Sequence, residues 1–267
     1  MSNKGTYDRY VRYSDQCGDH RFGGLLGESI QPLLGGAMWT DDHVRDGDEV
    51  LLSSVNLLTP VLPSKVVCVA SNYRKHAIEM GKSLPTVPKL FIKPSTSVIG
   101  PGVDIEIPPG TQRVDHEAEL GVVIGTTMCR VDKHHALEHV FGYVCLNDVT
   151  ARDFQRQDGQ FTRGKGFDTF CPIGPWVSTG LSPHDLGIRC SVDGQLRQDG
   201  RTSDMVFDVR TLLSFISSVM TLLPGDIVAT GTPSGVGPLQ PGQRVSIEIE
   251  GIGALNNPVC NRVDRHG

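Results

Sequence analysis

The sequence predicts a mainly β protein with a few short helices. Most apolar runs are short and rich in β-branched residues, as in VVCVA at 66–70, which is typical of strands. Glycine and proline separate these runs in segments such as IGPG, LPGD and QPGQ, and these segments favour turns. The length of 267 residues and the 38% hydrophobic content suit one large domain, or a main domain with a small appendage.

In chain order, the first predicted unit is a small β-rich module over residues 1–60, where glycine pairs and DGDEV interrupt short apolar runs. The main predicted domain, 61–267, carries most of the strands. Within it the pattern of apolar residues predicts helices at 74–80, 133–140, 151–157 and 208–221. The last of these has apolar residues at helical spacing and Asp208 as its N-cap.

Charge and composition argue against several classes of protein. A net charge of −5 and a pI near 6.0 show no basic surplus, so nucleic acid is not an expected partner. No apolar run approaches the roughly 18 residues of a membrane span, and MSNKGTYDRY lacks the apolar centre of a signal peptide. We therefore expect a cytoplasmic protein. The seven cysteines are scattered and never spaced as C-x-x-C, so we expect reduced, mostly buried thiols.

Two glutamates stand one residue apart in VDHEAELGVV, residues 114–123, at the start of an apolar run. On one strand, Glu117 and Glu119 would share a face and repel each other, so a cation is expected between them. Asp148 follows the apolar run FGYVCLN, at the end of a predicted strand, where sites are commonly assembled. Three carboxylates suit Mg²⁺ or Mn²⁺ better than Zn²⁺. For the two glutamates alone, a solvated strand edge remains the alternative.

Two further stretches carry candidate catalytic groups. SNYRKHAIEMG places His76 and Glu79 three residues apart on a short helix, where a carboxylate fixes the tautomer of an imidazole and raises its basicity. The alternative is a surface ion pair. Lys165 stands between two glycines in TRGKGFD, which indicates either a flexible loop or a cation on backbone that passes close to a ligand.

Six segments of the chain have the order and spacing of the motifs of a known family. They are VVCVASNYRKHAIEMG, LFIKPSTSVIGPG, RVDHEAELGVVIG, GYVCLNDVTARDFQ, TRGKGFDTFCPIGPW and LLPGDIVATGTPSGVGP. Over roughly 63–260 the chain thereby resembles the fumarylacetoacetate hydrolase family, in particular its small bacterial-type acylpyruvate hydrolases and 2-hydroxyhepta-2,4-diene-1,7-dioate isomerases. The resemblance implies a catalytic domain over 61–267 with a distorted β-barrel or roll, a homodimer, and a divalent metal held by carboxylates.

The same resemblance assigns roles to individual residues. The implied ligands of Mg²⁺ or Mn²⁺ are Glu117, Glu119 and Asp148. The implied catalytic groups are the dyad of His76 and Glu79, together with Lys165. The implied substrate contacts are Tyr73, Arg152, Gln155 and Thr232. Some acylpyruvate-cleaving members carry an arginine just before the N-Y pair, whereas this chain has Ser71 there and offers Arg74 instead.

The function that the resemblance implies is a metal-dependent reaction on a small 2-oxo or 2,4-dioxo acid. The first hypothesis is hydrolysis of a C–C bond in an acylpyruvate or fumarylpyruvate, through an enolate, with His76 activating water. An isomerase, tautomerase or decarboxylase from aromatic-compound catabolism would share that enolate. A catalytically silent, ligand-binding member is the remaining alternative. With Lys165 and Arg152 counted against the three carboxylates, a bound divalent ion leaves one net positive charge for an anionic substrate.

Two other functions, that of a nucleotide-binding protein and that of a serine hydrolase, have little support in the sequence. GTPSGVG and GKG look like phosphate loops, but neither belongs to a G-x-x-x-x-G-K-[ST] or G-x-G-x-x-G pattern. Ser234 in GTPSG does not fit the G-x-S-x-G pattern of a serine hydrolase.

Overall fold

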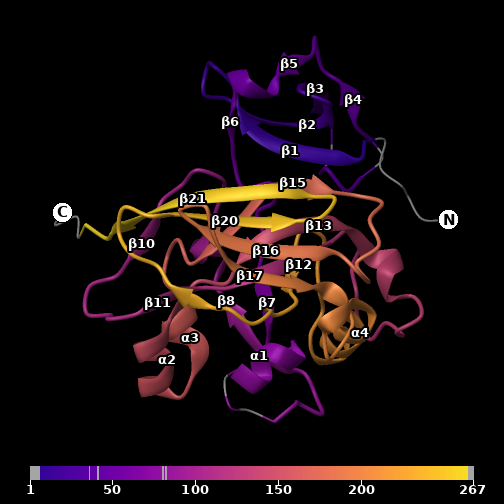
Figure 1. The fold of residues 1–267 in the computed structure, drawn as a ribbon. Helices are drawn as coiled ribbons and strands as arrows, with labels where there is room; N and C mark the ends of the chain where they lie inside the picture. The colour runs from indigo at the N-terminus through magenta and orange to yellow at the C-terminus, as the bar shows by residue number, and fades with distance from the viewer. Residues whose placement is uncertain (1–6, 36, 41, 80, 82, 264–267) are drawn as a thin grey trace.

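The computed structural model describes residues 7–263, apart from positions 36, 41, 80 and 82. It is mainly β, as predicted, with four α-helices in the described residues. The N-terminal strands stand at one end of the molecule, and the α-helices lie toward the opposite end (Figure 1). All seven cysteines are free thiols, and four of them are buried. Among the described helices, none has the length and apolar character needed to cross a lipid bilayer.

The largest sheet has thirteen strands and joins the N-terminal strands to the rest of the fold. Its main path runs in the spatial order β4 (Val44–Arg45), β3 (Ser29–Leu34), β2 (His20–Leu26), β1 (Arg9–Ser14), β15 (Cys171–Ser178), β13 (Val140–Asn147), β12 (Ala118–Ile124), β18 (Ile227–Ala229), β7 (Val66–Ala70) and β8 (Lys89–Lys93). Off this path, β5 (Val50–Leu51) pairs with β3, β6 (Asn56–Leu57) with β1, and β9 (Val98–Ile99) with β15. Because β1 pairs with β15, the predicted N-terminal module shares a sheet with the main domain. The division at residue 60 stays a prediction.

Two smaller sheets complete the described β structure. The five-stranded sheet has the order β10 (Ile105–Ile107), β21 (Gly253–Asn261), β20 (Arg244–Ile249), β16 (Gly187–Val192) and β17 (Gln195–Arg201). The three-stranded sheet has the order β14 (Thr150–Ala151), β11 (Val114–His116) and β19 (Gly237–Pro238). None of the described sheets closes into a barrel, because the path of the largest sheet begins at β4 and ends at β8 without pairing between them.

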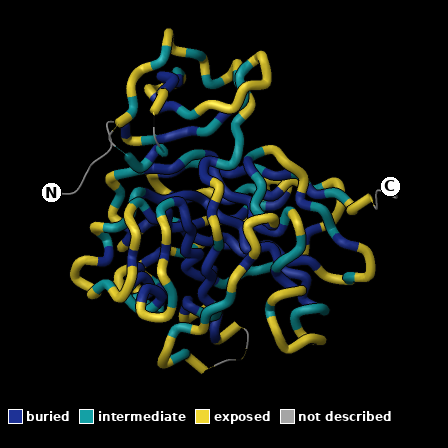
Figure 2. The backbone as a smooth tube through the Cα atoms, turned by 180° about the vertical axis from the view of Figure 1, so that it is seen from behind, coloured by how far each residue is buried: buried dark blue, intermediate teal, exposed yellow. Residues whose placement is uncertain are grey.

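The main core lies between the largest sheet and the five-stranded sheet. Leu120 and Val122 of β12 belong to it together with Ile247 of β20 and Leu255 of β21, and all four are nearly or fully buried. Figure 2 shows the buried backbone running through the central strands of the body. β12 is buried along its whole length, so its polar residue Glu119 enters the core with its apolar neighbours.

The helices are α1 (Arg74–Glu79), α2 (Arg152–Asp158), α3 (Phe161–Lys165) and α4 (Val209–Val219), with 3₁₀ turns at Leu52–Ser54, Ser95–Ser97, Ala136–His139 and Thr202–Asp204. Three of the predicted helices correspond to α1, α2 and α4, although position 80 lies outside the described residues. Asp208 caps α4 as predicted, because its carboxylate accepts from Thr211 N at 2.7 Å.

Two helix predictions need correction. The helix predicted at 133–140 is wrong: its backbone bonds span three residues, as in Glu138 N to His135 O, and the chain enters β13 at Val140. In contrast, α3 was not predicted, because Gly164 and Gly166 argue against a helix. A Cβ at Gly164 would lie 2.8 Å from Gln155 Cβ of α2, so glycine allows these two short helices to pack closely.

Candidate active site

Three buried carboxylates meet where the largest and the smallest sheet join. Glu117 lies in the one-residue gap between β11 and β12, and Glu119 is the second residue of β12. Asp148 directly follows β13, whose last residue, Asn147, pairs with Ala118 of β12. Asp148 N also donates to Glu117 O at 2.9 Å. This register brings one oxygen of each carboxylate within 4.8 Å of the others.

Two buried lysines bind this carboxylate cluster. Lys165, at the end of α3, donates to Glu117 Oε2 at 2.9 Å and to Asp148 Oδ2. Lys93, at the end of β8, donates to Asp148 Oδ1 at 2.6 Å and to Val149 O at 3.1 Å. Burial opposes the charge of Lys165, but Asp148 and Glu117 raise its pKa above the ordinary lysine value. Lys165 therefore serves as a fixed cation inside the fold, and Lys93 forms a buried ion pair with Asp148.

Lys93 was not among the predicted site residues, although it lies in LFIKPSTSVIGPG, one of the six motifs. Its local feature is that it ends an apolar strand directly before Pro94, a position that a surface lysine can also occupy. Lys93 is fully buried, and a lysine is almost never fully buried unless it is paired. The partner, Asp148, is separated by 55 positions in the sequence, so local pattern alone does not identify the pair.

An arginine connects the cluster to a neighbouring carboxylate. Arg152, the first residue of α2, binds Glu117 Oε1 through one terminal nitrogen and Asp115 Oδ2 through Nε at 2.8 Å. Its other terminal nitrogen donates to Gln155 Oε1 at 3.1 Å. Asp115 also holds the Arg113 guanidinium, with bonds of 2.8 and 3.2 Å. The predicted substrate contacts Arg152 and Gln155 thus lie beside the carboxylates, and Asp115 is a further member that was not predicted.

The cluster has the donor set that a hard divalent ion requires. Burial raises the pKa of Glu119, and the nearby Asp148 and Glu117 carboxylates raise it further. Burial also opposes ionisation of Glu117, but Lys165 and Arg152 hold its pKa below the ordinary range. In the described part of the chain Glu119 has no lysine or arginine partner; its Oε2 accepts from Gly231 N at 2.8 Å. Three neighbouring carboxylate oxygens, one without a cation, fit Mg²⁺ or Mn²⁺.

The predicted dyad is formed on α1. His76 Nδ1 lies 3.2 Å from Glu79 Oε2, and the His76 side chain is 9% exposed. The carboxylate accepts a hydrogen bond from Nδ1–H, which leaves Nε2 as the proton acceptor of the ring. Glu79 also accepts from Gly235 N at 3.1 and 3.2 Å through its two oxygens. The dyad is therefore held against the loop that follows β18.

A buried glutamine fixes two parts of the site at once. Gln198 of β17 accepts from Ala118 N at 3.0 Å, between the two glutamates, and donates to Thr232 Oγ1 at 2.7 Å. Its second donor bond, to Pro233 O at 2.9 Å, fixes which end of the amide is nitrogen. His116 Nδ1 lies 3.0 Å from the same Gln198 oxygen, so His116 donates there. Sequence reasoning missed Gln198, which belongs to a strand of another sheet.

The remaining predicted substrate contacts have different surroundings. Tyr73 is almost fully buried and forms a β-bridge with Met205, and burial raises the pKa of its hydroxyl. Neither Tyr73 nor Arg74 lines the described cavity around the carboxylates, whereas Ser71 does. The structure thus places Arg152, Gln155 and Thr232 along this cavity, whereas Tyr73 lies close enough to Glu119 for that carboxylate to raise its pKa further.

Two adjacent cavities lie over the cluster. The inner chamber, about 40 Å³, is lined by Val69, Ala70, Ser71, His76, Phe91, Glu117, Asp148, Arg152, Gln155, Phe161, Lys165 and Thr232. The outer chamber, about 450 Å³, is lined by Arg113, Asp115, Arg152, Gln155, Arg156, Gly159, Phe161 and Val236. The two chambers share the side chains of Arg152, Gln155 and Phe161 as a common wall.

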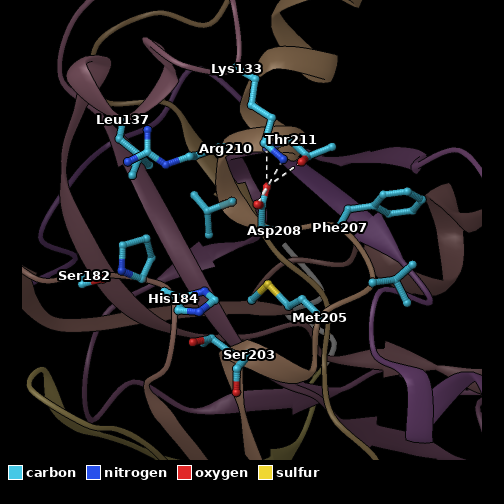
Figure 3. Close-up of a pocket in the computed structure, with 14 residues that line it drawn as sticks. Lys133, Leu137, Ser182, His184, Ser203, Met205, Phe207, Asp208, Arg210 and Thr211 are labelled. Atoms are coloured by element: carbon cyan, nitrogen blue, oxygen red, sulfur yellow. Dashed lines mark hydrogen bonds and ion pairs between the residues drawn. The ribbon is translucent and has the colours of Figure 1, made fainter.

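A third cavity, about 540 Å³, lies beside α4 and contains none of the predicted catalytic or metal-binding residues. Figure 3 shows Asp208 in this cavity, bound to Lys133 at 3.1 Å and to Thr211. Its wall includes Val206, whose N donates to Asn72 O at 2.7 Å. The wall of this third cavity therefore contacts the segment before α1. The cavity is separate from the carboxylate cluster, since Glu117, Glu119 and Asp148 do not line it.

Comparison with known proteins agrees with this arrangement. The family described as fumarylacetoacetate (FAA) hydrolase, C-terminal, matches residues 65–260. Rv2993c of Mycobacterium tuberculosis is 50% identical over 214 residues, which are 79% of this chain and 81% of that protein. The oxaloacetate tautomerase YisK of Bacillus subtilis is 44% identical over 223 residues, which are 78% of this chain and 74% of that protein.

Solved structures share the fold over nearly the whole chain. The 2-hydroxyhepta-2,4-diene-1,7-dioate isomerase of Mycobacterium marinum is 42% identical, with a TM-score of 0.88 and coverage of 95% of this chain and 98% of that one. The maleylpyruvate hydrolase of Sphingobium sp. SYK-6, solved with manganese(II) and pyruvate, is 30% identical, with a TM-score of 0.79 and coverage of 96% and 100%. On the family match and these identities, the chain belongs to the fumarylacetoacetate hydrolase family.

Proposed function

We propose that the protein is a divalent-metal-dependent enzyme that acts on small 2-oxo acids by stabilising their enolates. The observation that carries this proposal is the convergence of three carboxylates, Lys165 and Arg152 in one buried cluster that opens into the His76-lined inner chamber. The manganese and pyruvate in the maleylpyruvate hydrolase structure support the same chemistry. In this proposal Glu117, Glu119 and Asp148 are the metal ligands.

The mechanism assigns separate tasks to the residues of the chain. Lys165 and Arg152 supply positive charge for the substrate carboxylate and for the negative charge that develops on the oxo oxygen. A divalent ion held by the three carboxylates would add Lewis acidity at that oxygen. His76 accepts or returns the proton at Nε2, because the Glu79 carboxylate holds Nδ1. The bond from Gly235 N to Glu79 keeps this dyad over the chamber.

Proton transfer, as in a tautomerase or isomerase, is the reaction that we propose first. A cavity needs about 10–15 Å³ to hold one water, so the inner chamber of about 40 Å³ holds roughly three water-sized groups. This is space for the reacting head of a small acid in contact with His76. The relatives that are 42% and 44% identical carry isomerase and tautomerase names.

Hydrolysis of a C–C bond in 2,4-dioxo acids, the first hypothesis from the sequence, is the second candidate. The observation that favours it is the outer chamber of about 450 Å³, which gives room for an acyl group beyond the reacting head. His76 would then activate a water instead of transferring a proton on the substrate. Decarboxylation would use the same enolate. The presence of His76, Glu79 and Lys165 argues against a catalytically silent, ligand-binding member of the family.

One panel of assays tests the proposal and separates the reactions. The purified protein would be given enol-oxaloacetate, an acylpyruvate and keto-oxaloacetate, each with Mg²⁺, Mn²⁺ or EDTA, and loss of enol, loss of acylpyruvate and release of CO₂ would be followed. We expect metal-dependent loss of enol-oxaloacetate above the spontaneous rate. Turnover that persists after chelation and desalting, or no turnover of any of the three, would refute the proposed function.

We also propose that the chain forms a homodimer and acts in the cytoplasm on small-molecule acids from aromatic-compound catabolism. The support is the chain's membership of the family and its similarity to the isomerase and hydrolase structures described above. Light scattering of the purified protein tests the dimer directly. A monomer mass at assay concentration would contradict it.

A further inference from the structure

The outer chamber continues the candidate site toward solvent along α2. Arg152 and Gln155, three residues apart on this helix, form the wall between the two chambers. Arg156 follows directly and lines only the outer chamber. Residues four apart on a helix lie on the same side, about 6 Å apart along the axis. Arg156 is therefore one turn outward from Arg152, on the path from the reacting head to solvent.

Of the three arginines that line the outer chamber, two pair with a carboxylate of the protein and one does not. Asp115 binds both Arg113 and Arg152, so these two guanidinium groups face a carboxylate of the protein. Arg156 is exposed and has no hydrogen bond or ion pair to any residue that the structure describes. An arginine that lines a cavity without a partner is available to bind a carboxylate of a ligand, since its planar fork matches the two oxygens of that group.

We propose that the outer chamber binds the distal carboxylate of a short dicarboxylic 2-oxo acid and that Arg156 is the residue that determines this specificity. The inference rests on the proposed function, because the reacting head must occupy the inner chamber for its tail to meet Arg156. Arg152 then contacts the head and Arg156 contacts the tail, one helical turn apart. Monocarboxylic 2-oxo acids of equal length leave Arg156 unpaired and bind more weakly.

The test compares ligands that differ only in the distal charge. Oxaloacetate and 2-oxoglutarate, each beside its distal methyl ester, would be titrated with Mg²⁺ as competitors of bound oxalate. For wild type we expect at least one diacid to bind about tenfold tighter than its ester, or about 1.4 kcal/mol. The preference stays modest because an exposed ion pair is screened by water, and it should shrink as salt is added.

Substitutions at Arg156 test whether its guanidinium group causes the preference for the diacid over its ester. Arg156→Met should reduce the difference between diacid and ester to about twofold or less, and Arg156→Lys should keep part of it by retaining the charge. Arg189→Met is the matched control: this exposed arginine of β16 pairs with Asp199 and lines neither chamber, so the preference should be unchanged. Oxalate affinity should be equal in all four proteins, because oxalate reaches only the inner chamber.

The outcomes distinguish this inference from the proposed function. If wild type binds neither diacid more tightly than its ester, or if Arg156→Met keeps the preference while oxalate still binds, the role of the outer chamber is refuted and the enolate site stands. If oxalate fails to bind to wild type in the presence of Mg²⁺, the proposed function is refuted, and this inference with it.

Discussion

The buried pair of Lys93 and Asp148 gives the sharpest test of the cluster. Lys93 is fully buried, Asp148 is 1% exposed, and Nζ lies 2.6 Å from Oδ1. Breaking a buried ion pair by removing one partner costs about 3–5 kcal/mol. Because Lys165 still binds the other oxygen of Asp148, we expect Lys93→Met to cost about 3 kcal/mol, the lower end of that range. For a chain of this size that is a fall in Tm of about 6 °C.

The assay is thermal unfolding in EDTA and in Mg²⁺, with Lys133→Met as the matched control. Lys133 pairs with Asp208 at 3.1 Å, but both side chains are about half exposed, so its loss should cost about 0–1 kcal/mol. A ligand at a hundred times its Kd stabilises the folded state by about 2.7 kcal/mol. Mg²⁺ should stabilise Lys93→Met by more than wild type, because it replaces the cation that Asp148 lost. Equal Tm losses in Lys93→Met and Lys133→Met, or equal gains with Mg²⁺ in Lys93→Met and wild type, would refute this reasoning.

Three further predictions concern the metal, the base and the positioning glutamine. The raised pKa of Glu119 means that the folded apo protein keeps a proton that the unfolded chain has lost, so its stability in EDTA should fall as pH rises from the ordinary glutamate range through the raised pKa. In the same pH range, Mn²⁺ binding should release this proton. Calorimetry in two buffers would detect the release, which should be absent in Glu119→Gln. His76→Ala should lower kcat about 10²–10⁴-fold with Mn²⁺ affinity unchanged, and Glu79→Gln should have a milder effect; equal kcat in wild type and His76→Ala would remove the base. Gln198→Leu should weaken Mn²⁺ binding about tenfold and raise KM by freeing Thr232, whereas lower stability with unchanged Mn²⁺ affinity would mean a purely structural role.

The contacts of the site that could be predicted from the sequence are those between residues close together in the chain. Glu117 and Glu119 are two residues apart, and His76 and Glu79 are three apart, so local geometry nearly decides their contacts. The reason given for the first pair was incomplete, because Glu117 lies between two strands of different sheets and not within one strand. The backbone bond from Asp148 N to Glu117 O, rather than a shared strand face, brings the third carboxylate to the pair.

The residues that were missed act across large sequence separations. Gln198 meets Ala118 across 80 positions, and Lys93 meets Asp148 across 55. Neither residue stands out locally, because a glutamine in a strand and a lysine at a strand end are both common on protein surfaces. Their burial follows only from how the sheets pack. The same holds for α3, whose glycines oppose a helix locally but allow it to pack on α2.

The charge balance of the cluster explains why a deprotonated substrate should bind best. Lys93 adds a third cation to Lys165 and Arg152. In the metal-bound state, in which Glu119 has released its proton, these three cations balance the three carboxylates. With a divalent ion bound, the net formal charge of the site would be +2, which is one more than the +1 predicted from the sequence. A 2-oxo monocarboxylate brings one negative charge and its enolate brings two, so the charges balance only after the proton has left, which favours the transition state over the ground state. Oxalate, a planar dianion, should therefore bind more tightly than pyruvate and only with metal present, and Lys165→Met should remove most of that difference. Metal-independent inhibition by oxalate, or equal affinity for pyruvate, would show that the site does not select the enolate charge.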